Sequence, residues 1–260
     1  MPDEPDDGLY YAGELARQGR LDEAIQVLYR LLEVDPQNFE VRNAVIEYAK
    51  RNGNYASVIY QLMDCSELYV LAGEMISAME QYHKILRLEE TVQLGIHNRT
   101  DAVMQVRRLV AQVKPEIYLR IGELHFEHGQ IDQAVQYLTQ SSKLKSGIWD
   151  THYALGRCYL QKEMFSEAVD ELHEVARLTQ EDGPDAQAMA YELLGEVSMR
   201  QQRPPEETVP WLERAASLYA QGHQDSNARA VFGRIIELDP ANTVALTGLA
   251  ELDGRAKGNS

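Results

Sequence analysis

The chain has 260 residues, 44% of them hydrophobic, which is enough to bury a core. Its 25 Lys and Arg against 41 Asp and Glu give a net charge of −16 at pH 7. This charge argues against nucleic acids and anionic membranes as partners, because both are bound through cationic side chains, and it favours basic proteins instead.

Apolar residues recur at helical spacing through most of the chain, as in Leu21, Ala24, Ile25 and Leu28, and strand patterns are nearly absent. Five glycines stand where a helix needs a left-handed closing residue: Gly19, Gly53, Gly73, Gly129 and Gly222. We expect disorder in residues 1–6 and 256–260. Between them, the sequence predicts an all-α chain of short helices joined by tight turns.

Small residues recur in pairs that are twelve positions apart, and a large apolar residue follows four positions after each pair. Such pairs let two antiparallel helices approach closely, while the large residue fills the adjoining gap. This packing offsets the roughly 1 kcal/mol that glycine costs inside a helix. The five pairs are Ala12 and Ala24, Ser66 and Ala78, Gly122 and Ala134, Gly156 and Ala168, and Ala216 and Ala228.

The pattern slips at two places. Ile46 and Val58 are twelve positions apart but neither is small, and Gly195 would pair with Glu207 beyond the interruption "QQRPPEE". A long helical stretch follows each slip, at 55–72 and 206–221. Each stretch is either one long helix or a kinked pair.

The pairs resemble the tetratricopeptide repeat family, whose helix–turn–helix unit has 34 residues. The family pattern appears at His152, Leu155, Gly156, Tyr159, Ala168 and Leu172, and in the preceding copy at Tyr118, Ile121, Gly122, His125, Ala134 and Leu138. "LLEVDPQN" and "IIELDPAN" resemble the ends of units. The resemblance implies a right-handed superhelical solenoid of antiparallel helix pairs with about six to seven units.

The quality of the match varies along the chain. Residues 7–92 form an N-terminal set of repeats, and residues 115–255 form a C-terminal set that ends in a capping helix. Residues 93–114 match poorly and form an irregular joining segment between them. Within this segment "GIHNRT" is expected to be a loop, and "DAVMQVRRLVAQV" a helix.

Catalytic, cofactor and metal sites are not indicated. Glu80 and His83 have a spacing that metal ligands use, but they flank the inward-facing Tyr82, which places them mostly on the solvated side. His125 and His128 are also three positions apart, but His128 precedes Gly129 at a helix C-terminus, where a positive charge interacts favourably with the helix dipole. Cys158 has no evident general base, and no glycine loop follows a strand. We therefore expect a protein that is not an enzyme and has no cofactor. The absence of a leader and of a long apolar run predicts a cytoplasmic protein without membrane insertion.

In the family, the first helix of each unit lines a concave groove that receives segments of partner proteins. The resemblance implies a protein-binding scaffold or adaptor that takes a basic, partly apolar segment. The alternative is a self-associating or regulatory module of a larger assembly, and homo-oligomerisation stays open. The groove rows, with five acids against one arginine, are Glu116, Leu119, Glu123, Phe126, Asp150, Tyr153, Arg157, Leu160, Met189, Glu192, Glu196 and Met199.

Overall fold

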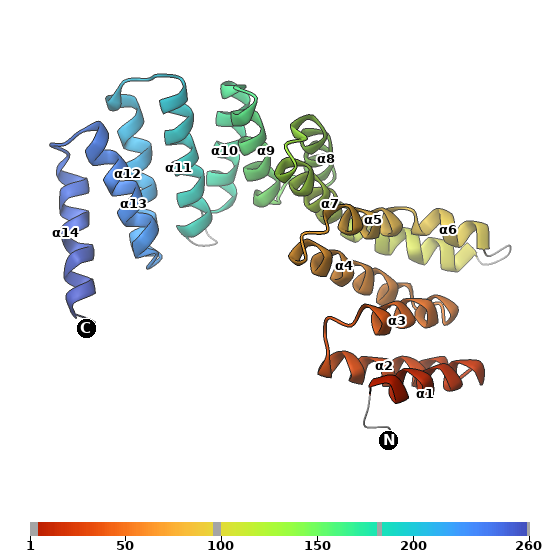
Figure 1. The fold of residues 1–260 in the computed structure, drawn as a ribbon. Coiled ribbons are helices and arrows are strands. Elements are labelled where there is room, and N and C mark those ends of the chain that lie inside the picture. Colours follow the sequence, from red (N-terminus) through yellow and green to blue (C-terminus); the bar gives the residue numbers. More distant parts are fainter. Residues whose placement is uncertain (1–4, 96–99, 181–183, 259–260) are drawn as a thin grey trace. The chain divides into compact units, whose positions relative to one another are not determined.

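The computed structural model describes residues 5–95, 100–180 and 184–258, and these ranges contain fourteen α-helices and no strand (Figure 1). The predicted all-α class is confirmed. Residues 1–4 and 259–260, expected to be disordered, lie outside the described residues, as do residues 96–99 of the expected loop. Helix nevertheless extends into both expected terminal segments, because the first helix begins at Pro5 and the last ends at Gly258.

The first of two compact units ends at Ile117. Each of its first five helices packs against the next one along the chain, so that helix pairs stack in sequence order (Figure 1). The helices of this unit are α1 (Pro5–Arg17), α2 (Leu21–Val34), α3 (Phe39–Arg51), α4 (Tyr55–Leu71), α5 (Met75–Leu86), α6 (Leu88–Gly95) and the first part of α7 (Thr100–Glu127).

The second unit begins at Tyr118 and contains the rest of α7. From α8 onward each helix again packs against the next, and α9 also contacts α11 while α12 contacts α14. The helices are α8 (Ile131–Leu144), α9 (Trp149–Gln161), α10 (Phe165–Leu178), α11 (Pro184–Arg200), α12 (Pro205–Gln221), α13 (Asp225–Leu238) and α14 (Thr243–Gly258).

The packing role predicted for Gly156 is confirmed. A Cβ atom added at Gly156 would lie 2.9 Å from Leu172 Cδ2, and one at Gly122 would lie 2.6 Å from Leu138 Cγ. Ala168, the small partner of Gly156, is fully buried. A side chain at Gly156 would therefore have to displace Leu172 at the contact between the two helices of this pair.

At Gly195, where the repeat spacing slips, the packing partner lies one residue beyond the fixed spacing. A Cβ atom at Gly195 would overlap Leu212, which places Thr208, four positions before Leu212, where Glu207 was expected. Thr208 is 1% exposed and its hydroxyl lies 2.8 Å from that of Ser198, whereas Glu207 is exposed. The turn that contains Pro204 is one residue longer than in the other pairs, and a fixed spacing cannot register that insertion.

Four of the five closing glycines have the predicted left-handed backbone: Gly19, Gly53, Gly73 and Gly129 have φ between 71° and 79°. Gly222 does not, because its φ is −76° and the next residue, His223, adopts φ 57° instead. A Cβ atom at Gly222 would overlap the Asp185 carboxylate. Glycine is needed there for close approach to the start of α11 and not for a left-handed turn.

Both long stretches whose form the sequence left open are single helices, α4 and α12, each of 17 residues. Helix α7 is longer still, with 28 residues, and continues through Pro115. The boundary expected at residue 115 therefore falls inside a helix, and the compact units meet two residues later, after Ile117.

Candidate functional site

Apart from Glu116, the residues of the predicted groove rows on α7, α9 and α11 lie in the second unit. The guanidinium of Arg157 on α9 lies over the ring of Phe126 on α7, with Cζ 4.4 Å from the ring centroid. Burial raises the pKa of the Tyr153 hydroxyl, and the nearby Glu192 and Glu196 carboxylates of α11 raise it further. The structure thus links the three helices through side chains of the predicted rows.

The apolar part of this surface is smaller than predicted. Phe126, Tyr153, Met189 and Met199 are partly exposed. Leu119 and Leu160 are each only 4% exposed and belong to core clusters with residues of α8 and α10, respectively. The cluster of Leu119 also includes residues of α9, and that of Leu160 includes residues of α11. They hold the helices together and leave little surface for a partner.

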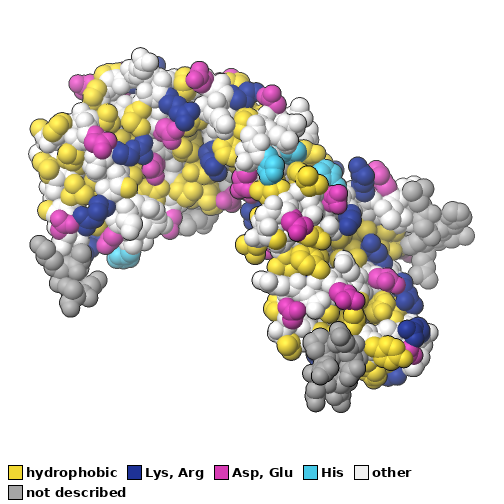
Figure 2. All heavy atoms as spheres, viewed as in Figure 1, with side chains coloured by type: hydrophobic (Ala, Val, Ile, Leu, Met, Phe, Trp, Pro, Cys, Tyr) yellow, Lys and Arg dark blue, Asp and Glu magenta, His cyan; other side chains and the backbone are white. Residues whose placement is uncertain are grey.

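The charge of the surface also differs from the predicted excess of acids. The Glu123 carboxylate is 3.1 Å from Arg120, and the Glu196 carboxylate is 2.9 Å from Arg200. Arginine side chains outside the predicted rows therefore balance much of the negative charge. On the face that Figure 2 shows, acidic and basic side chains are interspersed in the same way.

Glu192 is the most connected of these acids. It accepts a hydrogen bond from the Tyr219 hydroxyl at 2.9 Å and pairs with Arg234 at 2.8 Å. Burial, together with the hydrogen bond to Glu192, raises the pKa of Tyr219 and keeps it protonated as a donor. Glu192 therefore ties α11 to α12 and α13 and is a structural residue as well as a member of the row.

Arg120 and Arg200 could have been found from the sequence, because each lies three or four positions from its acidic partner on one helix. Arg234 and Tyr219 could not, since they are far from Glu192 along the chain and reach it only through the packing of α12 and α13.

Asp150 makes no ion pair with another described residue, and burial raises its pKa although Arg120 lowers it. Burial likewise raises the pKa of Glu123.

Glu116 is exposed on α7. It lies in the part of that helix that belongs to the first unit. It makes no ion pair with another described residue.

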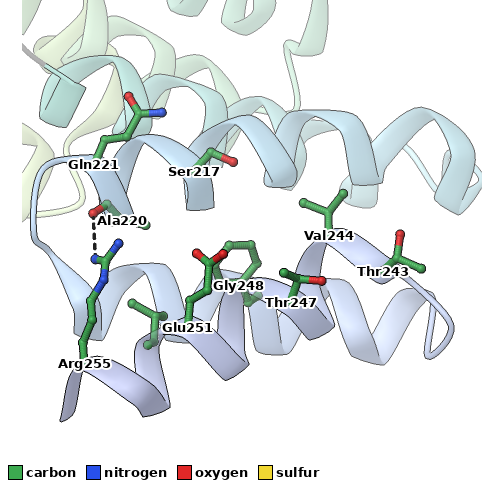
Figure 3. A pocket seen from close by; sticks show the side chains of 11 residues that line it. Ser217, Ala220, Gln221, Thr243, Val244, Thr247, Gly248, Glu251 and Arg255 are labelled. Atoms are coloured by element: carbon green, nitrogen blue, oxygen red, sulfur yellow. Dashed lines mark hydrogen bonds between the residues drawn. The ribbon is translucent and has the colours of Figure 1, made fainter. Parts of the chain in front are cut away.

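A cavity of about 500 Å³ between α12 and α14 was not predicted. Figure 3 shows Ser217 and Gln221 on one wall and Glu251 on the other, with the Arg255 guanidinium donating a hydrogen bond to the Ala220 carbonyl oxygen at 3.2 Å. Its polar residues on α14 recur every four positions, which is the signal that a search for helical stripes would have used: Thr243, Thr247, Glu251 and Arg255.

The side chains considered for catalysis or metal binding have other roles. His125 Nδ1 lies 2.6 Å from the Gln130 side-chain oxygen, and its ring stacks on Tyr137. Cys158 is fully buried, and burial raises the pKa of its thiol to about 12. Within the described ranges no cluster of three or more His, Cys, Asp or Glu residues is placed to hold a metal ion. In the same ranges, none of the helices has both the length and the apolar character to cross a membrane.

Two segments of the sequence, residues 5–56 and 125–193, match models of one family, described as the tetratricopeptide repeat. The protein is a tetratricopeptide repeat protein. The second segment contains α8, α9 and α10 in full, so the predicted row of α9 and its packing partners lie within tetratricopeptide repeats. No curated protein sequence matches the chain.

Solved structures agree with the fold. The crystal structure of BtubC (BKLC) from P. vanneervenii has a TM-score of 0.57 and 17% identity, covering 95% of this chain and 92% of that one. Two others are similar to a lower degree. MamA has a TM-score of 0.48 and 15% identity, covering 82% and 96%. YrrB, described as a TPR protein with an unusual peptide-binding site, has a TM-score of 0.42 and 17% identity, covering 94% of this chain and 90% of that one.

Proposed function

We propose that this tetratricopeptide repeat protein is a non-catalytic scaffold that binds a partly apolar, basic segment of a partner protein. The binding surface is formed by α7, α9 and α11 of the second unit. The observation that carries the proposal is the contact between Phe126 of α7 and Arg157 of α9. Tyr153, one turn before Arg157 on α9, is partly exposed like Phe126, so two neighbouring helices each present an aromatic ring. Aromatic side chains and arginine dominate the energetics of such surfaces.

The apolar part of the segment would cover Phe126, Tyr153, Met189 and Met199. Methionine adapts to irregular shapes, so the α11 side of the surface can follow different side chains. The basic part is supported by Asp150, which lacks an ion-pair partner among the described residues, and by the charge of −16 for the whole chain. Long-range charge steers association more than it adds affinity.

The proposed lack of catalysis is supported by the state of the reactive groups. Cys158 is buried with a pKa of about 12, so almost none of it is thiolate at neutral pH.

A cytoplasmic location is also part of the proposal. Both cysteines are free and buried, which is compatible with a reducing compartment.

The test is an affinity capture that compares three forms of the protein. The wild type, the double variant Phe126→Ala with Tyr153→Ala, and the control Tyr60→Ala each bind proteins from a native lysate, which mass spectrometry identifies. Tyr60 is 65% exposed on α4 of the first unit, so its loss is a matched aromatic truncation away from the surface. A partner retained by the wild type and the control but lost from the double variant supports the proposal. Equal capture by all three, or sizing that shows only self-association, contradicts it.

A further inference from the structure

The cavity between α12 and α14 has polar side chains on both walls that the protein itself does not use. Ser217 and Gln221 of α12 line one wall, and Thr247 and Glu251 of α14 line the other (Figure 3). None of these four side chains makes a hydrogen bond or an ion pair with another described residue. A ligand that enters the cavity therefore meets free oxygen acceptors on two sides.

Glu251 lacks the ion pair that its own helix offers. Arg255 follows Glu251 by four positions, and the same spacing joins Glu196 to Arg200 on α11 at 2.9 Å. An acid four positions before a base is the favourable order on a helix. The pair that forms on α11 is nevertheless not formed on α14.

Arg255 is bound by other groups at one end of the cavity. Its guanidinium donates a hydrogen bond to the Ala220 carbonyl oxygen at 3.2 Å and pairs with Asp225 of α13 at 3.3 Å. Asp225 thus balances the charge of Arg255, whereas no described residue pairs with Glu251. The unbalanced negative charge in the cavity favours a cationic ligand.

The remaining lining of the cavity is apolar. It consists of Ala220, Phe232, Val244 and Leu252, together with the backbone of Gly248. A Cβ atom at Gly248 would lie 2.3 Å from Phe232 Cζ, so a side chain there would have to displace the Phe232 ring. A ligand with an apolar stem and a cationic end matches this lining better than a bare cation does, and arginine and lysine side chains have such a stem.

We propose that this cavity binds the side chain of an arginine from a partner protein. The guanidinium pairs with the Glu251 carboxylate and donates to the side-chain oxygens of Ser217 and Gln221 on the other wall, while the stem lies along Val244 and Phe232. Arginine has five N–H donors in one plane and can serve two walls at once, whereas lysine has three donors at one point. The site goes beyond the surface of α7, α9 and α11 and can exist without it.

The probe for this site is the capped tripeptide acetyl-Ala-Arg-Ala-amide, titrated into the full chain labelled with nitrogen-15. Two-dimensional NMR follows the backbone amide signals of α12 and α14. Two companion peptides replace the arginine by lysine or by citrulline, which keeps the shape of arginine without its charge. Free arginine, titrated separately, tests whether the ligand is a small molecule and not part of a protein.

We expect saturable shifts on both cavity walls with the arginine peptide, at about 1 mM for a single partly solvated side chain. The variant Glu251→Gln should bind this peptide about fivefold more weakly or worse, because it loses the charged acceptor. The control Glu237→Gln changes an exposed acid of α13 outside the cavity and should bind like the wild type. Both positions are exposed, so both variants should keep the wild-type circular dichroism.

Four results would overturn the proposal. The first is the absence of saturable shifts on α12 and α14 up to about 10 mM peptide. The second is equal binding of the arginine peptide to the wild type and Glu251→Gln, and the third is equal binding of the citrulline peptide, because the carboxylate would then not recognise the charge. The fourth is tighter binding of the lysine peptide or of free arginine, because the ligand would then not be the arginine of a partner protein.

Discussion

The imidazole of His152 and the carboxylate of Glu171 form a part-buried ion pair that joins α9 to α10, with Nδ1 2.6 Å from the carboxylate oxygen. The other ring nitrogen, Nε2, lies 2.9 Å from the Ser146 carbonyl oxygen. Both partners are acceptors, so the geometry is satisfied in full only by a ring that carries two protons. In the family pattern this place holds a large aromatic residue, and here a charged ring links three segments of one repeat.

This pair predicts that stability depends on pH through His152. The bond to Glu171 raises the pKa of His152 in the folded protein, with smaller electrostatic contributions from Glu171 and Glu174. The stabilisation is therefore complete below the unfolded-state pKa of about 6.5 and is lost as the pH rises through the folded-state pKa. We expect urea denaturation to show the wild type losing its advantage over His152→Gln progressively as the pH rises above about 6.5. The variant His173→Gln, at an exposed histidine of α10, should follow the wild type; parallel curves for His152→Gln would contradict the assignment.

The close approach of α9 and α10 predicts a steric cost at Gly156. The variant Gly156→Leu should lose about 1–3 kcal/mol of unfolding free energy, because its side chain overlaps Leu172. Gly233 in α13 is the matched control, since a Cβ atom there meets nothing within 4 Å. Gly233→Leu should be neutral or should gain up to about 1 kcal/mol from helix propensity. Equal stabilities in chemical denaturation would remove the packing explanation.

In the part of the chain that the structure describes, three turns carry a left-handed residue that is not glycine: Glu163, Gln202 and His223, with φ between 56° and 57°. Replacing Glu163 by glycine should stabilise the protein by about 1 kcal/mol, because it relieves the Cβ strain of this backbone. Lys162, the preceding residue, has φ −83°, so Lys162→Gly should destabilise instead. Thermal denaturation of the two variants distinguishes these outcomes. A melting temperature of Glu163→Gly below that of the wild type would contradict the proposed backbone strain at Glu163.

The two cysteines should be inert in the folded protein. Cys65 and Cys158 are 1% and 0% exposed, and burial raises the pKa of both thiols, that of Cys158 to about 12. A thiol reagent at about pH 8 should react with neither until the protein is unfolded, and then with both. Fast labelling of Cys158 in the native protein would show that α9 is less well packed than described.

The fold could be predicted from the sequence where the determining contacts are local and periodic. Gly156 and Leu172 lie within one helix pair at a spacing that recurs, so their contact could be anticipated. Gly195 could not be assigned correctly, because one additional residue in the turn before α12 shifts its partner to Leu212. A pattern of fixed spacing fails wherever a turn changes length.

The candidate site was harder to predict for two reasons. Helical spacing gives the face on which a residue lies but not how far a neighbouring helix covers it, so Leu119 was assigned to the surface although it is core. Charge balance also depends on packing. Arg234 reaches Glu192 from another helix pair, and no local pattern connects the two residues.

The most direct test of the account is the affinity of the captured partner's binding segment, made as a peptide, for variants of the α7, α9 and α11 surface. Surface plasmon resonance at two salt concentrations gives both the affinity and its dependence on charge. Truncation of Phe126 or Tyr153 to alanine should weaken binding by about 1–3 kcal/mol at both salt concentrations, and Tyr60→Ala should leave it unchanged. Asp150→Asn should chiefly slow association at low salt. Affinities that are the same for the wild type, Phe126→Ala and Tyr153→Ala would contradict the central claim and place the partner elsewhere on the protein.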